Sequence, residues 1–108
     1  MSEASIISEI GSERATVGDG NKIVTWDGKT HIVWQDISRE GYLNQVRSYD
    51  HDSGEWTDTF TLGYGLDNHA RPILTIDHEG YLYVVLGGHN SPVTWRRSVR
   101  PNDATEWT

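Results

Sequence analysis

The stretch YDHDSGEWT (residues 49–57) recurs near the other end of the chain as RPNDATEWT (100–108). Its Glu-Trp-Thr ending therefore repeats at a spacing of 51 residues, from Thr57 to Thr108. Upstream, KIVTW (22–26) aligns with PILTI (72–76), and DGKTHIVWQD (27–36) aligns with EGYLYVVLGG (79–88). Each copy has strand composition on both sides of a Gly turn and ends in an acidic turn that closes on Trp. The chain is therefore an internal duplication rich in strands.

A repeat of about 50 residues that holds about four short antiparallel strands is typical of a β-propeller blade. We expect strands at residues 22–26, 31–37, 42–49 and 57–62 in the first copy and at 72–76, 81–87 and 93–99 in the second. The fold class predicted is all-β, with two four-stranded antiparallel blades in a single unit, 1–108. Residues 16–66 would form the first blade, and 67–108 the second blade without its outer strand. Residues 1–15 would supply an outer or latch strand, to this chain or to a neighbouring copy.

Composition supports this fold class and limits the partners. Five Trp, five Tyr and eleven Gly among 108 residues favour strands and turns. A net charge of −7 argues against nucleic acid as a partner, because phosphate binding needs a clustered basic surface. No apolar run is long enough to span a membrane, and no export signal is visible, so the location of this chain is left open.

Two blades side by side would leave broad apolar faces uncovered. We therefore expect self-association into a closed ring of three or four copies, a homo-oligomer that completes a propeller with an even number of blades.

Two of the five histidines, His69 and His89, are placed in a way that suggests a site. In the stretch GLDNHARPILTIDHEGYLYVVLGGHN (65–90), His69 precedes one predicted strand and His89 follows the next. Because those strands would be antiparallel, both side chains should lie at the same end of the blade. His51 and His78 fall in turns at the opposite end, and His31 lies at a strand start, so the sequence supports no function for these three.

The segment DNHARPILTIDHEGYLYVVLGGHNSPVTWRRS (67–98) resembles the BNR-repeat, sialidase-like propellers that include polysaccharide lyases of the ulvan lyase type. The resemblance rests on Asp-Asn-His before a strand, then Asp-x-x-Gly-Tyr, then Gly-Gly-His. Members of that family are propellers of several hundred residues and are expected to be secreted. The resemblance implies a fragment or minimal self-assembling unit of such a carbohydrate-active propeller, with little activity alone.

The resemblance also implies site residues. His69 and His89 would be catalytic in β-elimination on an acidic polysaccharide that contains uronate, with no cofactor. From their own positions, Arg71, Arg97, Asn68 and Asn90 are candidates to bind substrate, although Arg96 and Arg97 point in opposite directions on a strand and could equally be a solvated pair. No metal is expected, because two histidines without a third close ligand are weak evidence for zinc. A glycan-binding module that uses Trp26, Trp34 or Trp95, and a purely structural unit, stay open as alternatives.

Overall fold

The structure, a computed structural model, describes residues 4–16 and 20–108. These residues contain strands and turns and no α-helix, so none of them belongs to a helix that could cross a membrane. The eight strands are β1 (Ile23–Trp26), β2 (Lys29–Ser38), β3 (Gly41–Asp50), β4 (Glu55–Trp56), β5 (Phe60–Gly65), β6 (Ile73–Ile76), β7 (Leu82–Gly87) and β8 (Val93–Arg97). The all-β prediction is confirmed, and most strands lie within a few residues of their expected positions.

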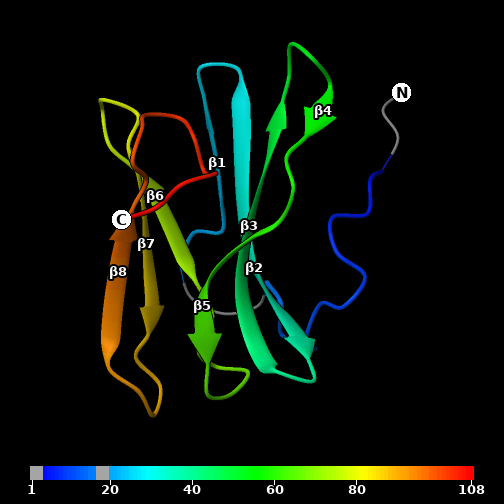
Figure 1. Cartoon of the computed structure of the whole chain (residues 1–108), viewed down its shortest axis with the longest axis vertical. Helices are drawn as coiled ribbons and strands as arrows, with labels where there is room; N and C mark the ends of the chain where they lie inside the picture. Colours follow the sequence, from blue (N-terminus) through cyan, green and yellow to red (C-terminus); the bar gives the residue numbers. More distant parts are fainter. Residues whose placement is uncertain (1–3, 17–19) are drawn as a thin grey trace.

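The strands form two antiparallel sheets that lie side by side (Figure 1). In the first sheet β1, β2 and β3 are neighbours, and both β4 and β5 pair with β3 at different positions along it. The second sheet has the order β6–β7–β8. Every pairing is antiparallel and, apart from that of β3 with β5, joins consecutive strands, close to the meander that the repeat predicts.

The hydrophobic core lies between the two sheets. Strand alternation explains it, because residues i and i+2 of a strand share a face. Val33 and Val46 are cross-strand partners in the first sheet, and Leu74 and Val84 are partners in the second. All four are almost completely buried and belong to one cluster, which also contains Leu62, Leu82, Leu86, Ala104 and Trp107.

Two further contacts fix the sheets against each other. Gly80 has a positive φ of 92°, and a Cβ there would lie 2.6 Å from the ring of Trp26, so only glycine lets this ring pack so closely. On β8, Arg96 donates from Nη1 to the carbonyl of Leu62 at 2.8 Å and from Nε to that of Thr108 at 2.9 Å. Arg96 therefore connects β8 with β5 of the first sheet.

The repeated Glu-Trp-Thr has the same role in both sheets. In the first, Trp56 pairs with Tyr49, and the amide of Thr57 donates to the carbonyl of Ser48. In the second, Trp107 forms a bridge with Ser98, and the amide of Thr108 donates to the carbonyl of Arg97 at 2.8 Å. Each turn thus brings its Trp back against the strand that precedes it.

The N-terminal segment differs from the prediction. Residues 4–15 form no strand, and residues 10–15 bond to β2 of the first sheet and not to β8. The amides of Ser12 and Ile37 donate to the carbonyls of Gln35 and Ile10 at 3.0 and 2.8 Å. The reason is that β1 pairs only with residues 29–32, which leaves the rest of this β2 edge to accept another segment. Figure 1 shows the segment on the side of the first sheet away from the second; residues 1–3 lie outside the described part.

Candidate functional site

His69 and His89 lie side by side at one end of the second sheet. Their ring centroids are 4.7 Å apart with an angle of 33° between the planes, and both side chains are about half exposed. His69 precedes β6 and His89 follows β7, and antiparallel pairing of these strands brings the two loops together. The turn before β7 and the β3–β4 turn, which contain His78 and His51, lie at the opposite end of the molecule (Figure 1).

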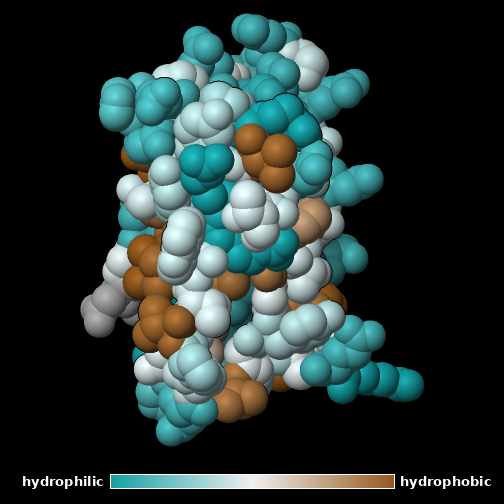
Figure 2. Space-filling view, turned by 60° about the vertical axis from the view of Figure 1, so that its left-hand side comes forward, coloured by the Kyte–Doolittle hydropathy of each residue, from teal (hydrophilic) through white to brown (hydrophobic). Residues whose placement is uncertain are grey.

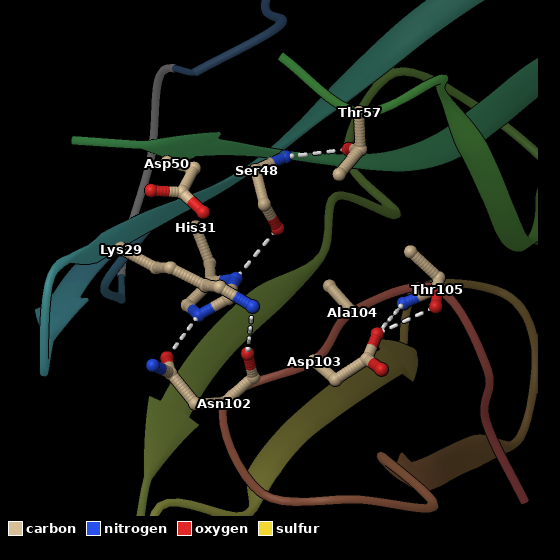
Figure 3. Close-up of a pocket in the computed structure, with 9 residues that line it drawn as sticks. All are labelled: Lys29, His31, Ser48, Asp50, Thr57, Asn102, Asp103, Ala104 and Thr105. Carbon is tan, nitrogen blue, oxygen red and sulfur yellow. Dashed lines mark hydrogen bonds between the residues drawn. The ribbon is translucent and has the colours of Figure 1, made fainter. Parts of the chain in front are cut away.

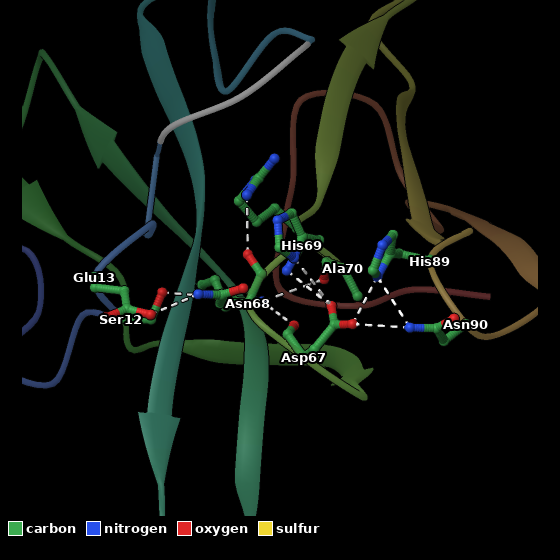
Figure 4. Close-up of polar contacts among 10 residues, drawn as sticks. Ser12, Glu13, Asp67, Asn68, His69, Ala70, His89 and Asn90 are labelled. Carbon is green, nitrogen blue, oxygen red and sulfur yellow. Dashed lines mark hydrogen bonds and ion pairs between the residues drawn. The ribbon is translucent and has the colours of Figure 1, made fainter.

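Asp67 organises this pair (Figure 4). Its Oδ2 lies 2.6 Å from Nδ1 of His89 and accepts from Nδ2 of Asn90 at 3.2 Å, while its Oδ1 accepts from the backbone amide of His69 at 2.8 Å. Desolvation alone would raise the pKa of the Asp67 carboxyl, but these hydrogen bonds together lower it below its ordinary value. The site therefore holds a carboxylate beside two imidazoles.

The partner of His89 determines its chemistry. When Nδ1 of the neutral ring donates to the Asp67 carboxylate, Nε2 is the nitrogen whose lone pair is free to accept a proton. An imidazole oriented in this way is suited to proton transfer, because its ring position and tautomer are set by a neighbour.

A buried side chain from the first sheet supports the loop that carries Asp67. Gln35, completely buried on β2, donates from Nε2 to the backbone carbonyls of Asp67 at 3.1 Å and Ala70 at 3.4 Å. Its Oε1 accepts from Oγ of Ser12 at 2.8 Å. Sequence analysis missed both Gln35 and Asp67 as parts of the site. Asp67 stands in the Asp-Asn-His motif two residues before His69, and that spacing was the available signal.

The four predicted substrate-binding residues behave differently from one another. Asn90 joins the site through Asp67. Asn68 donates to Oε1 of Glu13 at 2.6 Å, and Arg71 donates to the backbone carbonyl of Asn68 at 2.9 Å. Both side chains therefore form hydrogen bonds within the protein.

Arg97 is not brought to the site. It pairs with Tyr83, and its guanidinium lies 4.4 Å from the ring centroid of Tyr81. Gly87, the β7 residue at the end nearer His89, pairs instead with Val93. Because β8 runs back along β7, Arg97 is carried to the other end of the sheet.

A second polar region lies at the opposite end, between the sheets (Figure 3). It is a cavity of about 200 Å³ lined by Lys29, His31, Ser48, Asp50, Thr57, Asn102, Asp103, Ala104 and Thr105. His31 is completely buried there, with Nδ1 2.6 Å from Oγ of Ser48 and Nε2 2.7 Å from Oδ1 of Asn102. Burial lowers the pKa of His31, against the hydrogen bond that its Nε2 donates to Oδ1 of Asn102, which raises the pKa. His31 thus joins β2 and β3 to the loop after β8.

The tryptophans offer little stacking surface. Trp34 is 4% exposed and donates from Nε1 to Asp36, and Trp26 packs on Gly80. Only Trp95 among the three is strongly exposed, at 65%.

Comparison with solved structures supports the fold. A solved structure described as a polysaccharide lyase of family PL25, an ulvan lyase bound to -[GlcA(1-4)Rha3S]-, matches with a TM-score of 0.66 over 87% of this chain and 28% of that chain, at 23% sequence identity. The similarity of the two backbones is consistent with the antiparallel β fold described above.

Sequence comparison gives particular relatives, all ulvan lyases. The chain is 26% identical to "Ulvan Lyase-PL25" of Pseudoalteromonas sp. (strain PLSV) over 75% of its own length, and 32% identical to an ulvan lyase of Nonlabens ulvanivorans over 58%. An ulvan lyase of Alteromonas sp. (strain LOR) is 30% identical over 58%. The chain spans 14–21% of the length of these relatives. No family model matches it. The resemblance to ulvan lyases is confirmed, while the wider BNR-repeat group is not.

Proposed function

We propose that this chain is a two-blade unit of an ulvan-lyase-type polysaccharide lyase and that His69 and His89 belong to its reaction site. The observation that carries the proposal is the exposed imidazole pair, 4.7 Å between centroids and oriented by Asp67. The relatives are ulvan lyases, and a solved one is bound to glucuronate linked to sulfated rhamnose, which supports an acidic polysaccharide as the substrate class.

The reaction proposed is β-elimination at a uronate. One imidazole takes the proton from C5, the electron pair left behind forms the C4–C5 double bond, and the C4–O bond breaks. The other imidazole gives a proton to the leaving oxygen. His89 can accept through Nε2 while Nδ1 donates to Asp67. Asn90 borders the same space and could donate to a substrate hydroxyl or carboxylate.

A lyase needs a cation to offset the uronate charge. Arg71, two residues after His69, is one candidate among the described residues, and its guanidinium donates to the carbonyl of Asn68. The chain also spans at most 21% of the relatives' lengths, so supporting groups would come from the remaining parts of such a protein. Because misplaced catalytic groups are costly in rate, we expect this chain alone to turn over ulvan weakly or not at all.

Self-association is part of the proposal. On the outer face of the second sheet Ile73, Val85 and Trp95 lie in register across β6, β7 and β8, and each is 37% exposed or more. Figure 2, in which the β8 side comes forward, shows apolar surface interrupted by polar side chains. A propeller packs blade on blade, so another copy would cover this stripe, three or four copies closing a ring. Light scattering that gives a monomer at micromolar concentration would contradict this assembly.

The second candidate function, glycan binding without turnover, is favoured by Trp95, whose exposed ring stands on this same face. Titration with ulvan oligosaccharides separates the two. If binding is lost with W95A and retained with H69A and H89A, the glycan-binding module is correct.

The test of the lyase site is a comparison of four proteins: the wild type, H69A, H89A and H78A. Ultraviolet absorbance reports the unsaturated product from ulvan, and nuclear magnetic resonance reports oligosaccharide binding even where turnover is weak. We expect H69A and H89A to lose both signals. H78A is the matched control, because His78 is an exposed loop histidine at the opposite end. Unchanged binding and turnover in both site variants would refute the proposal.

A further inference from the structure

We propose that Asp67, His69 and His89 form a binding site for a divalent transition-metal ion, with Zn²⁺ the ion that the donor set fits best. One potential ligand atom from each residue lies within 4.8 Å of those of the other two. Figure 4 shows the three side chains converging from the loop before β6 and the loop after β7. Together they supply two imidazole nitrogens and one carboxylate.

The donor types select the class of ion. Two histidines and one carboxylate form the kind of three-ligand set that holds zinc with a fourth position open to water. Ca²⁺ and Mg²⁺ prefer a shell of oxygens, so they would bind two imidazoles poorly. The site contains no thiolate, which excludes the ions that require sulfur.

The distances require only small movements. With metal–ligand bonds of about 2.1 Å, neighbouring ligand atoms in a tetrahedral site lie about 3.4 Å apart. Here Nδ1 of His89 is 2.6 Å from Oδ2 of Asp67, and Nδ1 of His69 is 3.9 Å from Oδ1. Because one ligand atom from each residue lies within 4.8 Å of the others, no pair must open or close by more than about 1.4 Å, and rotation of two half-exposed rings can supply this.

Neighbouring groups hold the carboxylate in place. The backbone amide of His69 donates to Asp67 Oδ1, and the buried Gln35 donates to the Asp67 carbonyl. Asn90 donates to Oδ2. Such partners behind the ligands orient them and reduce the cost of ordering them around an ion.

Metal binding at these atoms would compete with the proposed reaction, and this consequence rests on the proposed function. With Zn²⁺ on Nδ1 of His89, the neutral ring carries its proton on Nε2, so the nitrogen proposed to accept the C5 proton has no free lone pair. Zinc would therefore act as a reversible inhibitor of oligosaccharide binding or turnover at this site.

The experiment is a titration of the full chain with Co²⁺ and Zn²⁺, followed by visible absorption of bound Co²⁺ and by calorimetry. We expect one saturable site per chain, and at least a tenfold loss of affinity in H69A, H89A and D67N. H78A should bind as the wild type does. Circular dichroism without metal checks that each variant is folded. If an alanine variant is unfolded, D67N still tests the site, because Asn keeps the shape of the Asp side chain.

No saturable binding, or binding that survives both H89A and D67N, would overturn the site. The titration contains no polysaccharide, so its result is separate from the proposed function. If zinc binds while ulvan oligosaccharides do not, the metal site stands and the lyase proposal fails. If both bind and neither displaces the other, the competition is wrong.

Discussion

Replacing Gln35 with Leu should both destabilise the fold and disturb the histidine pair. Gln35 is completely buried and makes three hydrogen bonds, with Ser12 Oγ at 2.8 Å, the Asp67 carbonyl at 3.1 Å and the Ala70 carbonyl at 3.4 Å. Leu has a similar volume but no polar atoms, so each of these three groups would lose one hydrogen bond. Each neutral hydrogen bond contributes about 1 kcal/mol, and unpaired buried acceptors add to the loss. We therefore expect a decrease of about 2 to 3 kcal/mol in the free energy of unfolding.

For a domain of about 100 residues this corresponds to a melting temperature lower by about 10 to 20 °C. Calorimetry measures it, and imidazole signals in nuclear magnetic resonance spectra report whether His69 and His89 have moved.

The matched control is Gln45→Leu. Gln45 is also buried, at 6% exposed, and bonds to Asp36 and Thr61 on the other side of the first sheet. It should lower stability by a comparable amount without shifting the two histidine signals. A Gln35→Leu protein as stable as the wild type, or equal histidine shifts in both variants, would refute the reasoning.

Three further changes test other parts of the structure. His31→Gln should flatten the pH dependence of the free energy of unfolding. Burial lowers the pKa of His31 below its ordinary 6.5, so on acidification the unfolded chain binds a proton at this ring before the folded chain does. The stability that this group contributes is therefore complete above about pH 6.5 and decreases as the pH falls toward the lowered pKa of the folded state. Denaturant midpoints between about pH 7.5 and 5 measure this change. Equal changes of midpoint with pH in the wild type and in His31→Gln would contradict the assignment. Gly87→Ala should cost about 1 to 3 kcal/mol in the free energy of unfolding and move the His89 signals, because φ is 78° and a Cβ would clash with the Pro92 carbonyl oxygen. Unchanged melting and spectra would count against it. Leu74→Ala, completely buried between the sheets, should cost about 2 to 5 kcal/mol in urea unfolding, and a loss under about 1 kcal/mol would mean that the core collapses around the gap.

The sequence predicts the strands and the pairing of the two histidines well. Strand positions follow from apolar runs between Gly turns, and these are local signals. The closeness of His69 and His89 follows from a single geometric rule, since residues before one strand and after its antiparallel neighbour share an end. The repeated Trp56 and Trp107 also occupy matching positions, because the turn that leads to each is encoded within a few residues.

Features that depend on strand length and on neighbours across the core could not be predicted in this way. The N-terminal segment bonds to β2 because β1 is four residues long and β2 is ten, a difference that the apolar pattern does not show. Gln35 is polar within a strand, so its inward direction and its partners in the N-terminal segment and in the loop before β6 give no sequence signal. Arg97 was predicted to bind substrate as a cation on the third strand of the second blade, whereas the direction of β8 decides where it lies.

The pairing of β2 along both edges has a consequence for how the molecule opens. Its amides face β3 on one side, and on the other Val33, Gln35 and Ile37 donate to Lys22, Ala15 and Ile10. An amide exchanges its hydrogen with solvent only when its hydrogen bond is broken, and a strand without a free edge cannot open from one side. The slowest-exchanging amides should therefore lie in β2, at the rate set by global unfolding. The loops that carry His69 and His89 should exchange much faster, through local openings that leave β2 intact.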